Sequence, residues 1–317
     1  FTLNVIIGNI LGGLIAIHLH KRLKSPYVAW VIILILSILY RLYQLYIGPS
    51  ISFYDHLWGF YSGAIYDEIV SVDQKIQVFR ITTLILISLL FIFSTTYKSS
   101  KIVIFCLIIT VSWLIFKGYN IPLYHTYKQI RENLSQIAGT KQYQIIYSDQ
   151  NQDEMILLAK DHAFRVHQLQ QWFEDTHFDR FTTYVYDSSD QKATLMGARG
   201  TQITFPWRNE VHVQRSEFPH HLLKHEIAHV LAGKYSPTSL LHVPSKNLIP
   251  QMALIEGLAV AAAWDANDYD PHTWSRALLE LNILPKLEDI LTSDGFLYSE
   301  PSLAYTVTGS FIRYLKD

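Results

Sequence analysis

Charged residues and cysteine are both scarce in this chain of 317 residues. Only 17% of the residues are charged, against about 25% in ordinary soluble domains, and 50% are hydrophobic, so the composition predicts that part of the chain lies in lipid. The single cysteine, Cys106, excludes an internal disulfide and a cysteine-based zinc cluster. Lys and Arg number 26 against 27 Asp and Glu, which argues against nucleic acid as the main partner. Any metal site must therefore use histidine and carboxylate ligands.

The charges divide the chain near Lys117. Residues 1–117 carry nine Lys and Arg and four Asp and Glu, whereas the remaining 200 residues carry 17 bases and 23 acids. The first part also contains four apolar runs, each close to the roughly 17 to 25 residues of a membrane-spanning helix. We therefore predict a transmembrane domain over 1–117 and a second, water-exposed domain over 118–317. The four runs are 1–18, 27–47, 81–97 and 102–116.

The positive charges predict an orientation, because short cytoplasmic loops retain Lys and Arg. The connectors HLHKRLK (18–24) and YKSSK (97–101) contain bases and no acid, so we place both in the cytoplasm. The loop 48–80 holds all four acids of this part, and we place it outside, together with the chain that follows the fourth run. The lipid bilayer is thus one partner, and the second domain is extracytoplasmic. Arg41 opposes this orientation, and we interpret it as a side chain that reaches the membrane interface.

The outer loop contains an aromatic segment, FYDHLWGFYSGAIYDEIV. We interpret it as an interfacial belt or a short re-entrant piece, because Trp and Tyr favour the headgroup level. The alternative is a second metal site formed by the acids and the histidine of the segment. Its candidate ligands are Asp55, His56, Asp67 and Glu68.

The second part of the chain has the mixed periodicity of an α+β domain. The predicted strands are 142–147, 181–186, 201–205 and 210–213, with a turn at 206–209. The predicted helices are a polar connecting helix over 121–138, a helix over 153–173, and then about 219–233, 250–265, 273–282 and 302 to the end.

The strongest motif is H-E-I-A-H at 225–229, within a run of helical apolar spacing. On a helix, His225 and His229 share one face and can bind a single Zn²⁺, while Glu226 reaches the water molecule on the metal. Zinc lowers the pKa of that water, and the carboxylate can take its proton as the water attacks a polarised carbonyl. The alternative for these residues is an ordinary polar helix face.

A catalytic zinc ion needs a third protein ligand and one open position. A metzincin would have Gly and His where this chain has Ala232 and Tyr235, so that family is excluded. Glu256 lies in the apolar run MALIEGLAVAAAW, where an unpaired carboxylate is costly and needs a cation. We predict that Glu256 is the third ligand of one zinc ion per chain. A salt bridge to Lys or Arg, or a charge at a helix N-terminus, is the alternative.

H-E-I-A-H followed by a helix with E-G-L-A resembles the gluzincin clan of zinc metallopeptidases. GFYSGAIYDE, LMGARGTQI and YTVTGSFIRYL are similar to motifs of a bacterial group in which such a domain follows transmembrane helices. The resemblance implies multi-pass transmembrane helices followed by an α+β zincin-like (thermolysin-like) peptidase domain. It further implies that His225, His229 and Glu256 hold zinc and that Glu226 is the general base.

The same resemblance implies a peptide or protein substrate and a location in the bacterial inner (plasma) membrane. It leaves the oligomeric state open. The alternative function is a non-catalytic zinc-binding, assembly or sensor protein built on a peptidase fold. A transporter or sensor whose membrane part is active is less consistent with the spans, because they lack acids and paired charges.

The chain departs from the clan in two places. The interval between His229 and Glu256 is long, and we expect a loop over 236–250. Val260 stands where thermolysin-type enzymes have an Asp that orients a histidine, which leaves Asp265 as the candidate for that role.

A peptidase also needs a donor for the oxyanion that develops on the attacked carbonyl. Tyr305 resembles the Tyr before a Gly-containing helix in gluzincin aminopeptidases, and a packed helix tyrosine is the alternative. His272 is a second candidate, although its position favours the start of a helix. We place His220 and His221 at the solvent end of the zinc helix. By chain order and analogy, the strand over 201–205 is the edge that pairs with an extended substrate.

The two ends of the sequence lack the usual signals. The first residue is not Met, and the last predicted helix reaches Asp317 without a cap residue or a glycine stop. We expect a fragment of a longer reading frame. The H-E-I-A-H motif lies more than about a hundred residues after the last apolar run, so we expect the metal site in water and outside the membrane.

Overall fold

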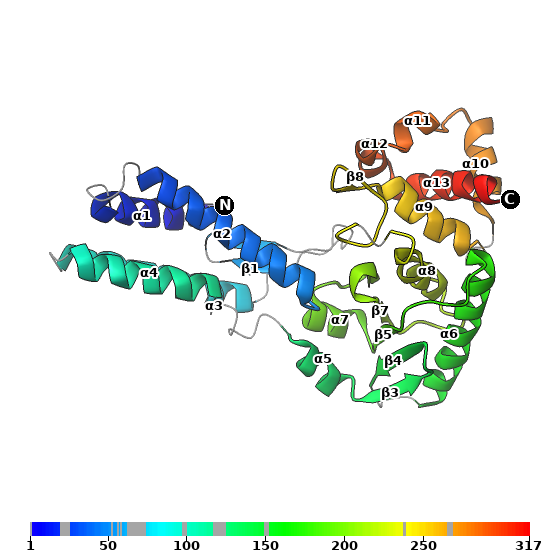
Figure 1. The fold of residues 1–317 in the computed structure, drawn as a ribbon, viewed down its shortest axis with the longest axis horizontal. Coiled ribbons are helices and arrows are strands. Elements are labelled where there is room, and N and C mark those ends of the chain that lie inside the picture. The colour runs from blue at the N-terminus through cyan, green and yellow to red at the C-terminus, as the bar shows by residue number, and fades with distance from the viewer. Residues whose placement is uncertain are drawn as a thin grey trace. The chain divides into compact units, whose positions relative to one another are not determined.

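The chain forms two compact units (Figure 1). The first unit is Phe1–Ile130 with Asp190–Thr201, and the second is Arg131–Ser189 with Gln202–Asp317. The computed structural model describes residues 2–19, 26–51, 53–55, 57, 59–61, 74–96, 100–116, 125–148, 152–236, 239–264 and 269–317.

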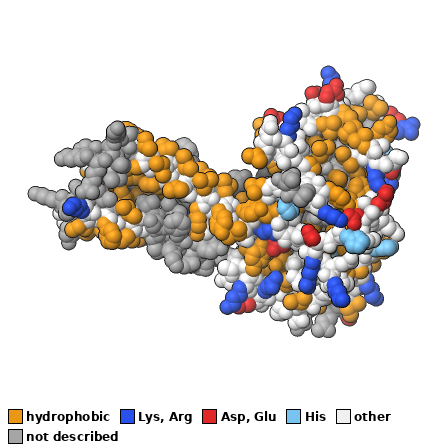
Figure 2. Space-filling model, in the orientation of Figure 1, with side chains coloured by type: hydrophobic (Ala, Val, Ile, Leu, Met, Phe, Trp, Pro, Cys, Tyr) orange, Lys and Arg blue, Asp and Glu red, His pale blue; other side chains and the backbone are white. Residues whose placement is uncertain are grey.

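Four helices occupy the four apolar runs of the first unit. They are α1 (Thr2–Leu19), α2 (Pro26–Ile47), α3 (Gln74–Thr96) and α4 (Ser100–Phe116). Among the described residues, two of these helices are long and apolar enough to span a membrane, over Tyr27–Ile47 and Phe79–Thr96. Many of their apolar side chains are exposed, and Figure 2 shows this hydrophobic surface in orange. Such a surface is unusual for a protein that lies in water and suits contact with lipid.

The environment of Arg41 on α2 differs from the prediction that its side chain reaches the membrane interface. Its side chain is only 3% exposed, and its Nη1 donates a hydrogen bond to Gln44 Oε1 at 2.7 Å. A polar partner one turn away allows the guanidinium to be buried within this unit, so it does not need to reach the membrane interface.

Much of the connecting sequence in this unit cannot be compared with its predictions. Within the aromatic segment, β1 (Phe53–Asp55) pairs antiparallel with β2 (Gly59–Tyr61). Most of the residues behind the predicted orientation and the alternative of a second metal site lie outside the described residues. These are Lys21, Arg22, Lys24, His56, Asp67, Glu68, Asp73 and Lys98.

A five-stranded mixed sheet lies at the centre of the second unit, with the order β3-β4-β5-β7-β6. β4, β5 and β7 are parallel, and the two edge strands, β3 and β6, run antiparallel to their neighbours. The strands are β3 (Gln136–Gly139), β4 (Tyr143–Tyr147), β5 (Phe181–Tyr186), β6 (Ile203–Phe205) and β7 (Glu210–Gln214).

Helices α6 (Gln152–Phe173) and α8 (Leu223–Gly233) pack on one face of this sheet. Alternation along the strands sends Ile145, Val185 and Val213 into the core that they share with both helices. α9 (Met252–Ala262) adds Ala259 and Ala262 to the same core.

The last helices form a second core, which also involves α9. Ala253 of α9 packs there with Phe296 and Val307. α9 therefore belongs to two hydrophobic cores at once. The helices that follow it are α10 (Pro271–Glu280), α11 (Leu287–Ile290), α12 (Ser293–Tyr298) and α13 (Pro301–Lys316).

The predicted α+β character is confirmed, but several elements differ from expectation, among them the short helices α11 and α12, which were not predicted. The connecting helix predicted over 121–138 is only α5 (Tyr127–Asn133), because Gln136–Gly139 pairs with β4 as a strand, and residues 121–124 are not described. α7 (Ser189–Met196) is short and weakly amphipathic, so the sequence pattern gave no sign of it. The expected loop over 236–250 contains the small hairpin β8–β9 (Ser245–Lys246 with Ile249–Pro250).

Candidate metal centre

Helix α8 presents the two histidines of the motif on the side that faces away from the sheet. Leu223, Ile227 and Val230 are buried in the sheet core, at the spacing of one helix face. This burial turns His225 and His229 away from the sheet, where their side chains remain 14% and 10% exposed. The apolar periodicity of the sequence therefore places both imidazoles on the side of the helix opposite to the sheet core.

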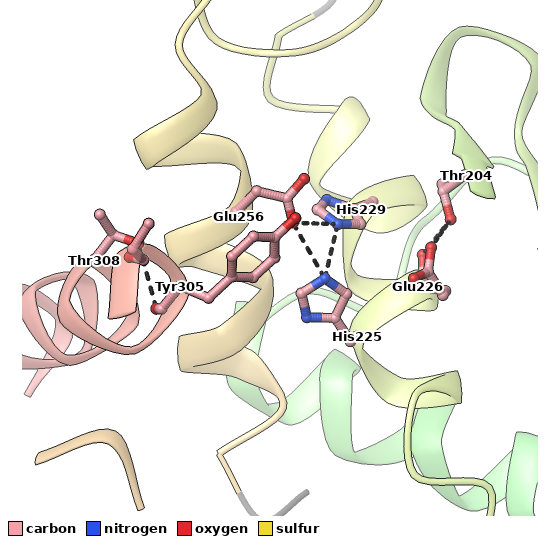
Figure 3. Close-up of polar contacts among 8 residues, drawn as sticks. Thr204, His225, Glu226, His229, Glu256, Tyr305 and Thr308 are labelled. Atoms are coloured by element: carbon pink, nitrogen blue, oxygen red, sulfur yellow. Dashed lines mark hydrogen bonds and ion pairs between the residues drawn. The ribbon is translucent and has the colours of Figure 1, made fainter. Parts of the chain in front are cut away.

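Glu256 reaches the same point from α9, and a close helix crossing fixes its position. A Cβ atom on Gly257 would lie 2.9 Å from a backbone oxygen of α13, and one on Gly309 would lie 2.2 Å from Val260 Cγ1. Only glycine fits at these two positions, so α9 and α13 approach closely. The crossing brings Glu256 of α9 and Tyr305 of α13 to the same side of the histidines (Figure 3).

Tyr305 lies one turn inside α13. The helix begins at Pro301, and the carboxylate of the N-cap residue Glu300 accepts a hydrogen bond from the backbone nitrogen of Leu303 at 2.8 Å. The Tyr305 ring lies 6.2 Å from the His225 ring, between centroids, at an interplanar angle of 29°. Figure 3 shows the ring pointing toward the histidines and not away from them.

The three predicted ligands meet in one group. His225 Nε2 and His229 Nε2 are 3.1 Å apart, and each lies 3.3 Å from Glu256 Oε2. A tetrahedral zinc ion with bonds of about 2.1 Å separates its ligand atoms by about 3.4 Å, so this triangle fits one face of such a site. These residues form the one His, Cys, Asp and Glu group of this kind in the described part of the chain. Two histidines and one carboxylate are also a known ligand set of catalytic zinc.

The charges in this group support one another. Burial alone would raise the pKa of Glu256, but the two imidazoles outweigh it and hold that pKa well below its usual range. Burial alone would lower the pKa of His229, but the carboxylate of Glu256, helped by Glu226, raises it instead. The site therefore holds an ionised carboxylate that favours a positive charge between the two imidazoles.

The carboxylate of Glu226, the residue after His225, points away from the three ligand atoms toward the sheet, which holds it. Its Oε2 accepts a hydrogen bond from Thr204 Oγ1 at 2.7 Å, and Figure 3 shows both side chains next to α8. Thr204 belongs to β6, an edge strand of the sheet. Sequence reasoning missed Thr204, because nothing in the local pattern indicates a contact across 22 residues.

The structure corrects the expectation for His220. Its side chain lies inside the fold and is only 2% exposed, whereas His221 is exposed as predicted. The backbone nitrogen of His220 donates to Asp161 Oδ2 at 2.9 Å, and its ring Nε2 lies 2.9 Å from the carbonyl oxygen of Gln214. These two bonds draw the residue inward from the end of α8.

Two further candidates were named from the sequence, His272 and Asp265. His272 lies in the first turn of α10, where its Nδ1 is 2.7 Å from Ser310 Oγ, in keeping with a residue at a helix start. Asp265, the candidate for orienting a histidine, is outside the described residues.

No protein-family model matches this chain, and a search of curated proteins finds no match to it.

Proposed function

We propose that this chain is a membrane-anchored zinc metallopeptidase of gluzincin type, which hydrolyses peptide bonds. The observation that carries the proposal is the triangle of ligand atoms from His225, His229 and Glu256, with sides of 3.1 to 3.3 Å. Glu226 follows the first histidine directly, as the general base of an H-E-x-x-H site does. The resemblance of both helices to the gluzincin motifs supports the same reading.

In this proposal each side chain has a separate chemical task. Zinc, when bound, supplies Lewis-acid activation of a water molecule and of the substrate carbonyl. The Glu226 carboxylate takes a proton from the attacking water and delivers it to the leaving amide nitrogen as the C–N bond breaks. The Tyr305 hydroxyl donates a hydrogen bond to the developing oxyanion.

The edge strand β6 is the proposed docking site for the substrate backbone. An extended peptide can add to an exposed strand edge through main-chain hydrogen bonds. β6 carries Thr204, which holds the Glu226 carboxylate, so a peptide paired with this strand lies next to the proposed base. The proposed substrate is therefore a peptide or a protein segment in extended conformation.

The membrane part of the proposal has α1 to α4 spanning the bacterial inner membrane, with the second unit outside the cytoplasm. The two helices that pass the length and hydropathy criteria support it, and the distribution of Lys and Arg supports the orientation.

A non-catalytic zinc-binding protein is the second candidate function, and one observation favours it. The Glu226 carboxylate accepts a hydrogen bond from Thr204. It does not belong to the group of ligand atoms of His225, His229 and Glu256, which lie within 4.8 Å of one another. A protein that binds zinc only for assembly or sensing needs the three ligands and no base.

The test uses the full chain in detergent micelles, with zinc content and cleavage of a peptide library as separate measurements. We expect about one zinc ion per wild-type chain, a large loss of zinc in Glu256→Ala, and retained zinc without peptidase activity in Glu226→Gln. Glu288→Gln, an exposed carboxamide variant on α11, is the matched control and keeps both properties.

The outcomes separate the candidates. Zinc-loaded wild type without cleavage of any peptide would overturn the peptidase and leave a zinc-binding protein. Full activity in Glu226→Gln would overturn the assignment of Glu226 as the general base. A folded wild type without zinc would overturn both.

A further inference from the structure

A second concave site lies in the second unit, at the carboxyl ends of its parallel strands. Asp187 follows β5 directly and Arg215 follows β7 directly, and both line a cavity of about 570 Å³. The start of α6 closes the cavity on another side through Glu154. The volume is that of a small-ligand pocket, and the carboxyl edge of parallel strands is where open α/β sheets bind ligands.

His220 lines this cavity and carries a buried hydrogen-bond acceptor. Its ring Nε2 faces the carbonyl oxygen of Gln214, which can only accept, so Nε2 carries the proton and Nδ1 keeps its lone pair. Nδ1 is buried and has no hydrogen-bond partner within the described residues. Burial also lowers the pKa of His220, which keeps the ring neutral. A ligand with an N–H or O–H donor would satisfy this atom.

The charged side chains around the cavity indicate the charge of the ligand that it would bind. Arg215 Nη2 pairs with Asp187 Oδ1 at 3.1 Å, and Arg165 Nε pairs with Asp161 Oδ1 at 3.1 Å. Glu217, also in the wall, has no ion-pair partner among the residues that the structure describes. Glu154 also lines the cavity, and its Oε2 lies 3.5 Å from Arg215 Nε. The lining thus holds four carboxylates and one guanidinium group, with Arg165 outside it, so the cavity favours a cation.

Apolar side chains complete the wall. Leu157 and Phe218 both line the cavity and are 43% and 59% exposed. They can cover an aliphatic stem, and the Phe218 ring can also attract a cation.

We infer that this cavity binds a cationic nitrogen on an aliphatic stem. The shared chemistry is an ammonium or guanidinium group that donates to His220 Nδ1 and is attracted by the surplus carboxylates. Such a group can come from a lysine or arginine side chain of a polypeptide or from a free alkyl amine. The inference does not depend on the proposed peptidase, because none of the three metal-binding candidates lines the cavity.

The test is calorimetric titration of the full chain in nanodiscs of zwitterionic phosphatidylcholine, which does not itself attract cations. The probes are a lysine tripeptide blocked at both ends, its norleucine counterpart and spermidine. We expect the lysine tripeptide to bind at least tenfold more tightly than the norleucine tripeptide. Stronger binding of the tripeptide than of spermidine identifies a polypeptide side chain as the ligand, and the reverse order identifies a free amine.

Two variants locate the binding. Glu217→Gln removes an exposed charge from the cavity wall and should weaken binding of the cationic probes at least threefold, whereas Glu132→Gln on α5, which does not line the cavity, should leave it unchanged. His220→Leu should weaken binding further. If His220→Leu does not fold, Glu217→Gln alone tests whether the probes bind in this cavity. Equal binding of the two tripeptides, no effect of Glu217→Gln, or no binding of either cation to the folded protein would overturn the inference.

Discussion

Thr204 holds the proposed base from a strand that lies 22 residues earlier in the chain. Replacement by valine keeps the shape of the side chain and removes the hydroxyl that donates to Glu226. The free energy of unfolding should fall by about 1 to 3 kcal/mol, because the buried carboxylate loses a charged hydrogen bond. We expect Thr204→Val to retain zinc and to lose peptidase turnover.

Thr182→Val is the matched control for this prediction. Its hydroxyl on β5 also takes part in a side-chain hydrogen bond, here as the acceptor from Gln144 Nε2 at 2.8 Å, but the pair is not part of the metal centre. Full turnover in Thr204→Val would show that the carboxylate of Glu226 needs no support from the sheet.

His162 is a fully buried histidine whose ring nitrogen lies 2.9 Å from Thr183 Oγ1. Burial lowers its pKa from 6.5 to about 3. In the unfolded chain the ring takes up a proton near pH 6.5, but in the folded chain it does not. Its contribution to stability is therefore complete above pH 6.5 and is lost as the pH falls toward 3, at about 1.4 kcal/mol per pH unit.

The measurement is denaturant unfolding of the full chain in detergent between pH 7 and pH 4. His162→Gln should lose stability less steeply than wild type as the pH falls, because the amide side chain does not titrate. His167→Gln, an exposed change on the same helix, should keep the wild-type slope. Equal slopes in all three proteins would contradict the prediction.

For single residues, the sequence predicted those features of the metal centre that depend on the spacing of neighbouring residues. The four-residue interval of His225 and His229 predicts a shared helix face, and the apolar neighbours of Glu256 predict a carboxylate that needs a cation. Thr204 could not be predicted, because its contact depends on how β6 lies against α8. His220 was placed wrongly, because polar sequence before a helix usually meets solvent, whereas here two hydrogen bonds draw the residue inward.

Among the elements, the crossing of α9 and α13 depends on two glycines. A methyl group at position 309 would overlap Val260, so Gly309→Ala should reduce stability by about 1 to 3 kcal/mol. To relieve this overlap, α13 would shift relative to α9. That shift would move Tyr305 relative to Glu256 and lower peptidase turnover. Thermal unfolding and cleavage assays of the full chain measure the two effects.

A second substitution tests the cause. Val260→Ala removes the Cγ1 contact at 2.2 Å and leaves the Cβ contact at 2.8 Å, so Val260→Ala/Gly309→Ala should recover only part of the lost stability and turnover. At Gly257 the obstruction is the backbone of α13, so no side-chain substitution there should rescue Gly257→Ala. Failure of the double variant to improve on Gly309→Ala would mean that the crossing does not set the position of Tyr305.

Elements with strong local patterns were predicted almost residue by residue. β5 occupies its predicted range of 181–186, and α6 differs from its prediction by one residue at its start. The strand β3 was predicted as helix, because its four residues have no clear alternation and are stabilised by pairing with β4. The glycine crossing was not foreseen, because a glycine within a helix gives no sign of which helix packs against it.

For the whole molecule, the surface of α2 decides whether the first unit lies in lipid. Leu36, near the middle of this helix, is 53% exposed. Arginine at the centre of a spanning helix costs about 2.5 to 3.5 kcal/mol of insertion free energy, so Leu36→Arg should reduce membrane integration of the chain. Resistance to carbonate extraction measures this, and Leu281→Arg, an exposed change in the second unit, should have no effect. Equal extraction of both variants would contradict a spanning α2.

α9 belongs to the core of the sheet through Ala259 and to the core of the last helices through Ala253. A cation that joins His225 of α8 to Glu256 of α9 would therefore also couple the opening of these two cores. Without it, the C-terminal helices can open as a separate cooperative unit, at a free energy below that of global unfolding. With it, that partial opening would also break metal bonds, so the two cores would open together and amide hydrogen exchange in α13 would slow.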